Sequence, residues 1–117
     1  MTKYVLVAED DNAIRGLLVG MLNGNGIECL DAADGEEAMK IFDADTESQI
    51  FFAILDRVMP MQDGVATYHG IRATHKTLPI AMISGNLNGI YFDDPYLTLL
   101  EKPFSMVKLA AMVAKHA

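Results

Sequence analysis

The sequence has little of what marks secreted, membrane-spanning or nucleic-acid-binding proteins. Cys29 is the only cysteine among 117 residues, which excludes an internal disulfide and fits a reducing compartment. Nine basic residues stand against 16 acidic ones, and the net charge of −7 disfavours contact with nucleic-acid phosphates or anionic lipid. Apolar runs of membrane-spanning length and a signal-peptide pattern are both missing. We therefore expect a cytoplasmic protein that binds neither nucleic acid nor membranes.

Repeats, linkers and low-complexity stretches are missing as well, so the chain is expected to form one domain. Short apolar runs alternate with amphipathic segments along it. The runs predict five strands, at 4–8, 27–32, 50–55, 80–84 and 96–101. Apolar residues at helical spacing predict helices at about 12–24, 36–44 and 65–73, and a last one after Ser105. This alternation is typical of a parallel sheet with helices on both faces.

The first predicted helix has an apolar stripe and two glycines away from it. Asp11 or Asn12 is expected to cap its start. The residues expected to face the core are Ile14, Leu17, Leu18, Met21 and Leu22. Gly16 and Gly20 lie off this stripe, where they weaken the helix. Two explanations stay open: close approach of a partner helix, or packing against the last helix.

Acidic, hydroxyl and basic residues stand where the predicted strands end. Glu9 and Asp10 follow the first strand, Asp56 the third, Ser84 closes the fourth and Lys102 follows the fifth. Ligands of open α/β sheets bind at these carboxyl ends, so the side chains are expected to converge. Carboxylates grouped without His or Cys point to a hard cation, Mg²⁺ rather than Zn²⁺. Taken singly, Glu9 could be an ordinary acid, Ser84 a turn residue and Lys102 a surface ammonium.

Together these residues carry a resemblance. From Tyr4 through about Ala114, the sequence resembles the receiver domain of two-component response regulators. The matching segments are 5–11 (VLVAEDD), 33–38 (ADGEEA), 55–60 (LDRVMP) with Asp63-Gly64, Ser84, and Lys102-Pro103-Phe104. The resemblance implies an α/β flavodoxin-like, three-layer sandwich with five parallel strands in the order 2-1-3-4-5. Residues 85–95 depart from the family, because their Gly, Asn and Asp residues predict that its fourth helix is shortened or absent here.

The same resemblance assigns roles to the residues at the strand ends. Asp56 becomes the phosphoacceptor, whose carboxylate takes a phosphoryl group from a phosphohistidine. Glu9, Asp10, Asp56 and the carbonyl of Val58 would hold Mg²⁺. The ammonium of Lys102 would pair with one phosphoryl oxygen, and the hydroxyl of Ser84 would donate a hydrogen bond to another. The Lys102–Pro103 bond is expected to be cis.

The sequence also departs from the family. Leu99 stands where many receivers place the aromatic switch residue, three positions before the lysine. Tyr91, Phe92 and Tyr96 cluster in the shortened region, where they either cover the exposed flank of the sheet or belong to a segment that becomes ordered on phosphorylation. Gly85 after the switch hydroxyl resembles a subgroup of bacterial single-domain receivers.

Two further positions bear on the lifetime of the phosphoryl group. Val58 and Asn86 each lie two residues after a site residue, flanking the path of the attacking water in the family. An apolar Val58 cannot orient that water, which leaves Asn86 as the alternative. The phosphoryl group is expected to be fairly long-lived.

The leading hypothesis is a single-domain response regulator, with residues 1–117 as the receiver and no output domain. Its partners would be a sensor histidine kinase or histidine phosphotransfer protein and an unknown downstream protein. Its only catalysis would be its own phosphorylation and dephosphorylation. One alternative is a pseudo-receiver that binds proteins without phosphorylation. Another is an aspartate-nucleophile phosphohydrolase, against which Val58 argues, because such enzymes usually place a second Asp there.

Overall fold

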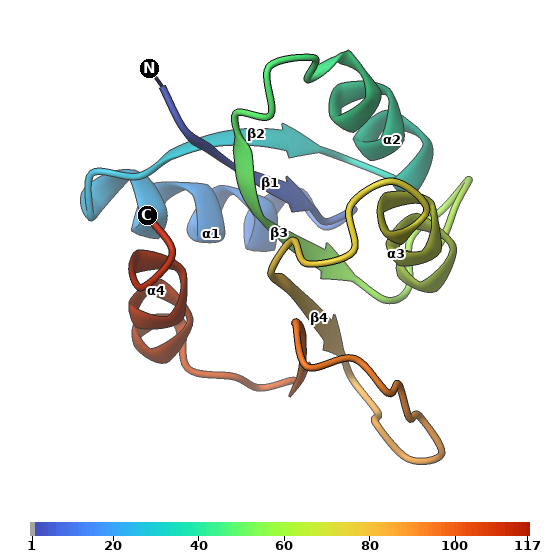
Figure 1. Cartoon of the computed structure of the whole chain (residues 1–117). Coiled ribbons are helices and arrows are strands. Elements are labelled where there is room, and N and C mark those ends of the chain that lie inside the picture. Colours follow the sequence, from blue (N-terminus) through green and yellow to red (C-terminus); the bar gives the residue numbers. More distant parts are fainter. Residues whose placement is uncertain (1) are drawn as a thin grey trace.

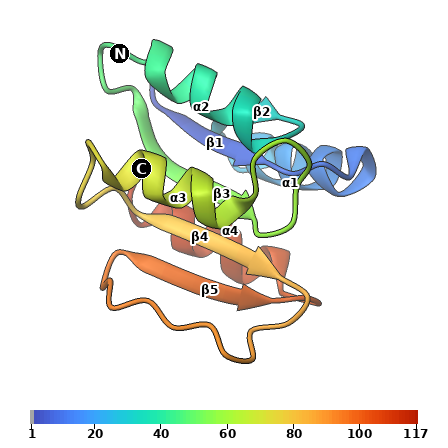
Figure 2. The same ribbon diagram turned by 90° about the vertical axis from the view of Figure 1, so that its right-hand side faces the viewer.

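The computed structural model describes residues 2–117 and shows a five-stranded parallel sheet in the order β2-β1-β3-β4-β5. Figure 1 labels the first four of these strands, and Figure 2 labels β5 beside β4. The strands are β1 (Tyr4–Ala8), β2 (Glu28–Ala32), β3 (Ile50–Asp56), β4 (Ile80–Ser84) and β5 (Leu97–Glu101). The helices are α1 (Asn12–Gly24), α2 (Gly35–Ala44), α3 (Gly64–Arg72) and α4 (Met106–Ala114). The predicted flavodoxin-like fold is confirmed.

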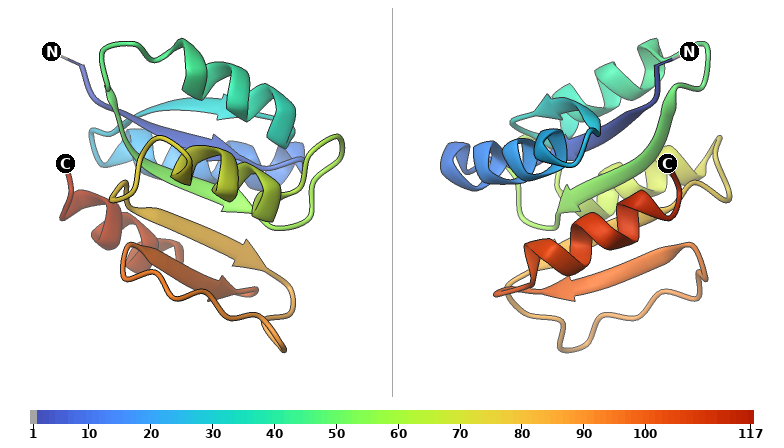
Figure 3. Two further views of the ribbon diagram at one scale, coloured as in Figure 1. Left: turned by 45° about the vertical axis from the view of Figure 1, so that its right-hand side comes forward. Right: turned by 90° about the vertical axis from the view of Figure 1, so that its left-hand side faces the viewer.

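The helices cover both faces of the sheet, which produces the three layers (Figure 3). One apolar cluster joins the sheet to α2 and α3 through residues such as Phe42, Tyr68 and Ile71. The other joins the opposite face to α1 and α4 through residues such as Leu18, Leu22 and Leu109. The three inner strands are buried on both faces, which explains why they appear in the sequence as continuous apolar runs.

Helix α1 confirms the predicted cap and corrects the predicted apolar stripe. The carboxylate of Asp11 accepts hydrogen bonds from the main-chain N–H groups of Ala13 and Ile14, so this residue is the cap. Leu18 and Leu22 are buried as expected. Leu17 is 60% exposed, so its placement on the inward stripe was wrong. The stripe is narrower because the opposing strands and α4 cover only one side of α1.

The connection from β4 to β5 contains no helix among the described residues, as predicted for the family's fourth helix. It runs beside β5 at the edge of the sheet instead of crossing a face (Figure 2). The ring of Phe92 packs edge-on against that of Tyr68, with centroids 5.1 Å apart. Tyr91 is 82% exposed and Tyr96 is also exposed, so neither covers the sheet as proposed. Neighbouring side chains of an extended segment point to opposite sides, which turns Tyr91 outward where Phe92 turns inward.

A partly buried ion pair fixes the far part of this connection to α3. The Arg72 Nε lies 2.7 Å from Oδ2 of Asp94, and the two side chains are only 11% and 10% exposed. The hydroxyl of Tyr68 donates to the same oxygen at 2.5 Å. The polar contacts of Asp94 therefore attach the β4–β5 connection to α3. A helix in this position would be attached mainly by burying apolar side chains.

No helix in residues 2–117 combines the length and apolar character that crossing a membrane requires.

Candidate phosphoacceptor and metal site

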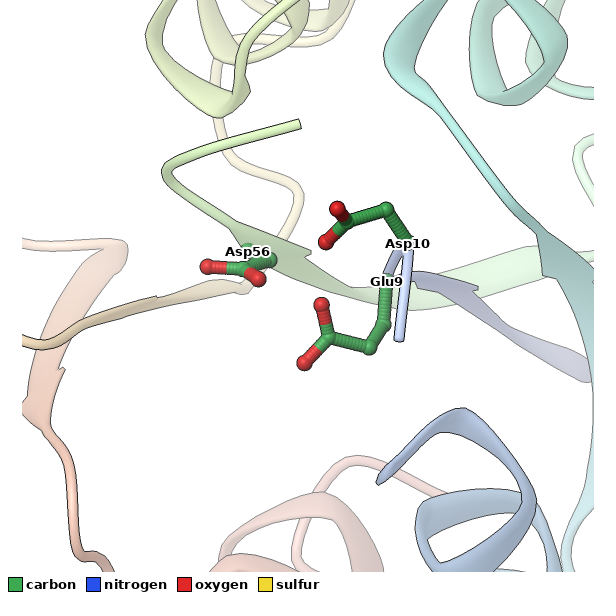
Figure 4. Close-up of side chains that lie close together, drawn as sticks. All are labelled: Glu9, Asp10 and Asp56. Carbon is green, nitrogen blue, oxygen red and sulfur yellow. The ribbon is translucent and has the colours of Figure 1, made fainter. Parts of the chain in front are cut away.

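The residues at the strand ends meet at one rim of the sheet, as predicted. Glu9 and Asp10 follow β1, Asp56 is the last residue of β3 and Ser84 the last of β4. Figure 4 shows the carboxylates of Glu9, Asp10 and Asp56 beside the ends of β1 and β3. Each offers one oxygen to a group of three whose members all lie within 4.8 Å of one another.

Lys102 faces this acidic group from the end of β5. Its Nζ lies 3.3 Å from Oδ2 of Asp56 and 3.6 Å from Oε1 of Glu9, and its side chain is 32% exposed. The alternative of a solvated surface ammonium is therefore wrong. The bond from Lys102 to Pro103 is cis, as expected from the resemblance, and Pro103 itself is exposed.

Glu9 is a buried acid of the rim whose ionised form is disfavoured. It is 2% exposed, and its Oε2 has no hydrogen-bond partner within the described part of the chain. Burial, reinforced by the hydrogen bond and the charge of Asp56, raises the pKa of Glu9 to about 8, although Lys102 acts in the opposite direction. The two carboxylates in turn raise the pKa of Lys102 in spite of its partial desolvation. The rim carries more negative charge than its single ammonium offsets.

This excess charge fits a bound divalent cation. All three groups offer oxygen ligands, the donors that Mg²⁺ prefers, and no His or Cys belongs to the group. A cation among them would provide the orphaned Glu9 oxygen with a partner and favour the ionised form of that carboxyl group. The donor set, rather than the fold alone, therefore makes the rim a candidate metal site.

Ser84 acts in this structure as the turn residue that the sequence left open. Its hydroxyl donates to the main-chain oxygen of Asn86 at 2.8 Å and accepts from the Asn86 N–H at 3.2 Å. The guanidinium of Arg57 donates to the same Asn86 oxygen at 3.0 Å. Sequence reasoning missed Arg57, although it directly follows Asp56.

The other predicted switch and water-path residues are dispersed. Gly85 and Asn86 adjoin the rim and are exposed, and Val58 is 72% exposed beside Asp56. The Asn86 Oδ1 is engaged by the N–H of Asn88 at 2.8 Å. Leu99 packs against the cluster beneath α2 and α3, on the same face as Phe92.

Two glycines permit the close approach of main chain at the rim. A Cβ on Gly64 would overlap the main-chain oxygen of Asp56, and one on Gly35 would overlap that of Gln62. Gly64 was part of the family resemblance, but only the structure gives it this steric reason. By contrast, a Cβ on Gly16 or Gly20 would meet nothing within 4 Å, so packing against α4 does not explain those two.

Comparison with known proteins agrees with this geometry. The chain matches the family model of the response regulator receiver domain over residues 5–114. It is 31% identical over 113 residues to the sensor kinase CckA of Brucella abortus, covering 93% of this chain and 12% of that protein. It is 30% identical over 116 residues to the transcriptional regulatory protein CpxR of Escherichia coli, covering 93% and 47%. The chain spans less than half the length of both relatives.

Solved structures show the same likeness. The receiver domain of a hybrid histidine kinase CckA superposes with a TM-score of 0.81 at 33% identity, covering 97% of each chain. The response regulator TrrA of Thermotoga maritima, in complex with Mg²⁺ and BeF, has a TM-score of 0.80 at 29% identity and covers 99% of this chain and 100% of that one. The fold and the acidic rim thus define a receiver of two-component signalling. The chain belongs to the response regulator receiver domain family.

Proposed function

We propose that this protein accepts a phosphoryl group from a phosphohistidine onto Asp56 and signals through protein contacts or onward phosphotransfer. The observation that carries the proposal is the position of Asp56, buried at the end of β3 with Lys102 Nζ at 3.3 Å and two further carboxylates beside it. A buried carboxylate placed between an ammonium and a cation site is suited to nucleophilic attack on a phosphoryl group.

In the proposed transfer, an Asp56 oxygen attacks the phosphorus atom while the bond between phosphorus and the donor's imidazole nitrogen breaks. The electron pair of that bond stays on the imidazole, which takes up a proton from solvent. Lys102 is placed to pair with a phosphoryl oxygen, and the Ser84 hydroxyl to donate to another once it leaves Asn86. Glu9, Asp10, Asp56 and the Val58 carbonyl would hold Mg²⁺, whose charge would offset that of the phosphoryl oxygens.

We extend the proposal to residues 1–117 as a receiver domain acting in the cytoplasm, with a sensor histidine kinase or histidine phosphotransfer protein as donor. Its catalysis would be limited to its own phosphorylation and dephosphorylation. The exposed Val58 side chain is apolar and the Asn86 Oδ1 is already engaged, so we expect slow loss of the phosphoryl group. The exposed surface of α1 around Gly16, Leu17 and Gly20 is where we place the donor's helix.

The test is phosphorylation with Mg²⁺ and acetyl phosphate, followed by measurement of the intact mass. The wild type should gain one phosphoryl group, and Asp56→Asn should gain none. Asp11→Asn is the matched control, because Asp11 is a nearby acid that caps α1 and should leave the adduct unchanged. Catalytic turnover of a small phosphoester would favour the phosphohydrolase, and the absence of any adduct on the wild type would favour the pseudo-receiver.

A further inference from the structure

The turn after Ser84 is tied to the rim by two hydrogen bonds that meet on one oxygen. The main-chain oxygen of Asn86 accepts from the Ser84 hydroxyl at 2.8 Å and from Nη1 of Arg57 at 3.0 Å. Ser84 is buried and its hydrogen bond to Asn86 is partly buried, whereas the hydrogen bond from the half-buried Arg57 to Asn86 is exposed to solvent. Hydrogen bonds from a charged group are stronger than those between neutral groups, which offsets part of the weakening of the Arg57 hydrogen bond by solvent.

The main chain of Arg57 is fixed by hydrogen bonds to two neighbouring elements. Its N–H donates to the oxygen of Ile83 in β4, and its oxygen accepts from the N–H of Gly64 at the start of α3, both at 2.8 Å. The guanidinium therefore reaches the turn from a fixed point one residue after the phosphoacceptor.

The two ties respond differently to phosphorylation. A serine hydroxyl has one proton to donate. If Ser84 donates to a phosphoryl oxygen on Asp56, as the proposed function requires, the oxygen of Asn86 loses that donor and keeps only Arg57. The Arg57 tie involves neither Asp56 nor the phosphoryl group directly, so it can persist in both states.

We propose that Arg57 is a positioning residue that keeps the turn at residues 84–86 on the rim when the Ser84 hydroxyl transfers to the phosphoryl group. This inference rests on the proposed function for the movement of Ser84, but not for the tie itself. The opposite end of the β4–β5 connection is held by Arg72 and Asp94, which contact neither Ser84 nor Asp56. The hydrogen bonds that hold the near end, at residues 84–86, thus change on phosphorylation, whereas the contacts of the far end, at Asp94, do not.

The first test needs no phosphoryl group. Amide hydrogen exchange at Leu87 and Asn88 is compared in the wild type, Ser84→Ala, Arg57→Ala and the double variant. The Asn86 amide is left out, because its N–H donates to the Ser84 hydroxyl and loses that partner directly in Ser84→Ala. With two ties on one oxygen, each single variant should exchange only slightly faster, because the other tie remains. The double variant should exchange about tenfold or more faster than the wild type, the size expected for losing a charged hydrogen bond. Arg57→Lys, which keeps a cationic donor, should restore part of the protection in the Ser84→Ala background.

The second test adds Mg²⁺ and beryllofluoride as a phosphoryl mimic, with binding checked on every variant by native mass spectrometry. Loading should raise exchange at Leu87 and Asn88 only slightly in the wild type. In Arg57→Ala it should raise exchange about tenfold, to the level of the unloaded double variant. Asp94→Asn is the control at the far end, where any effect on exchange should be the same with and without the mimic. A dependence on loading is what a merely structural role of Arg57 would not produce.

The outcomes separate this inference from the proposed function. If Arg57→Ala changes exchange by the same factor with and without the Ser84 hydroxyl, or changes nothing in the double variant, Arg57 is not the tie. If wild-type protein binds no beryllofluoride, the proposed function fails, while the unloaded variants still decide the role of Arg57.

Discussion

The rim cluster of Glu9, Asp56 and Lys102 and the α3 cluster of Tyr68, Arg72 and Asp94 differ in how their charges balance. Both contain a cation within hydrogen-bonding or ion-pairing distance of a carboxylate, which is buried in the rim cluster and partly buried in the α3 cluster. In the rim cluster one ammonium faces several carboxylates, and the pKa of Glu9 is raised to about 8. Burial also acts to raise the pKa of Asp94, but hydrogen bonds from Tyr68, Arg72 and the Tyr96 N–H outweigh it and the pKa is lowered.

This difference distinguishes a binding site from a structural contact. The α3 cluster pairs its cation with its own carboxylate and needs no added ion, although Nη2 of Arg72 lacks a hydrogen-bond partner within the described residues. The rim cluster is unfavourable until a cation or a proton joins it, and such perturbed groups gather at functional sites. Composition alone would not have separated the two, because each combines acids with a basic residue.

The largest effect is expected from breaking the balanced cluster. Asp94→Ala leaves the partly buried Arg72 guanidinium without its carboxylate, which should lower the free energy of unfolding by about 3 kcal/mol, the lower end of the range for breaking a buried pair. Asp94→Asn keeps an acceptor and should cost less. Urea denaturation measures both, with Asp93→Ala as the matched control, since Asp93 is exposed. A loss of under about 1 kcal/mol for Asp94→Ala would place this pair among ordinary surface ion pairs.

The next effect is the pH dependence of stability, where the clusters have opposite signs. The folded protein holds the Glu9 proton up to about pH 8, and the unfolded chain releases it near 4.5. Folding is thus favoured by this group below pH 4.5, and the contribution is lost as pH rises towards 8, at up to about 1.4 kcal/mol per unit. Asp94, whose pKa is lowered from 3.8, contributes stability above that value and loses it as pH falls below.

Denaturation in the presence of EDTA from pH 3 to pH 9 measures this profile, with stability falling between pH 4.5 and about 8. Glu9→Gln is the control and should remove the fall at high pH while keeping the loss in acid. Mg²⁺ should reduce the fall as well, because it favours the ionised carboxylates, and its stabilising effect should increase with pH. A wild-type profile that is flat from pH 5 to pH 8 without metal would show that Glu9 is not held protonated.

The smallest effect concerns the tyrosine of the balanced cluster. Tyr68→Phe removes one donor to Asp94 and leaves Arg72 in place, so the free energy of unfolding should fall by about 1.5 kcal/mol. The pKa of Asp94 should rise, which moves the acid limb of the profile to higher pH. Tyr91→Phe, at an exposed ring, should change neither quantity. Equal effects of the two substitutions would mean that the hydrogen bond from the Tyr68 hydroxyl does not stabilise the Asp94 carboxylate.

Much of the fold could be predicted because its signals are local. The continuous apolar runs of β1, β3 and β4 and the caps at Asp11 and Ser105 depend on residues a few positions apart. The candidate site could be predicted for a related reason, since parallel strands bring their carboxyl ends to one rim. The prediction drawn from periodicity failed at Leu17, and the covering role suggested by the clustering of aromatic residues failed at Tyr91. In both cases the side that faces the core depends on what covers it.

The sequence by itself determined the strands, their ends and hence the meeting of Glu9, Asp10, Asp56, Ser84 and Lys102. Only the tertiary structure decided which polar groups pair across the molecule. Asp94 reaches Tyr68 and Arg72 across 26 and 22 residues, and Arg57 reaches Asn86 across 29. These contacts depend on the path of a connection that has no periodicity. The conformation of a segment without periodicity depends on the residues that contact it. Which residues those are is determined by the packing of the whole chain rather than by neighbouring residues.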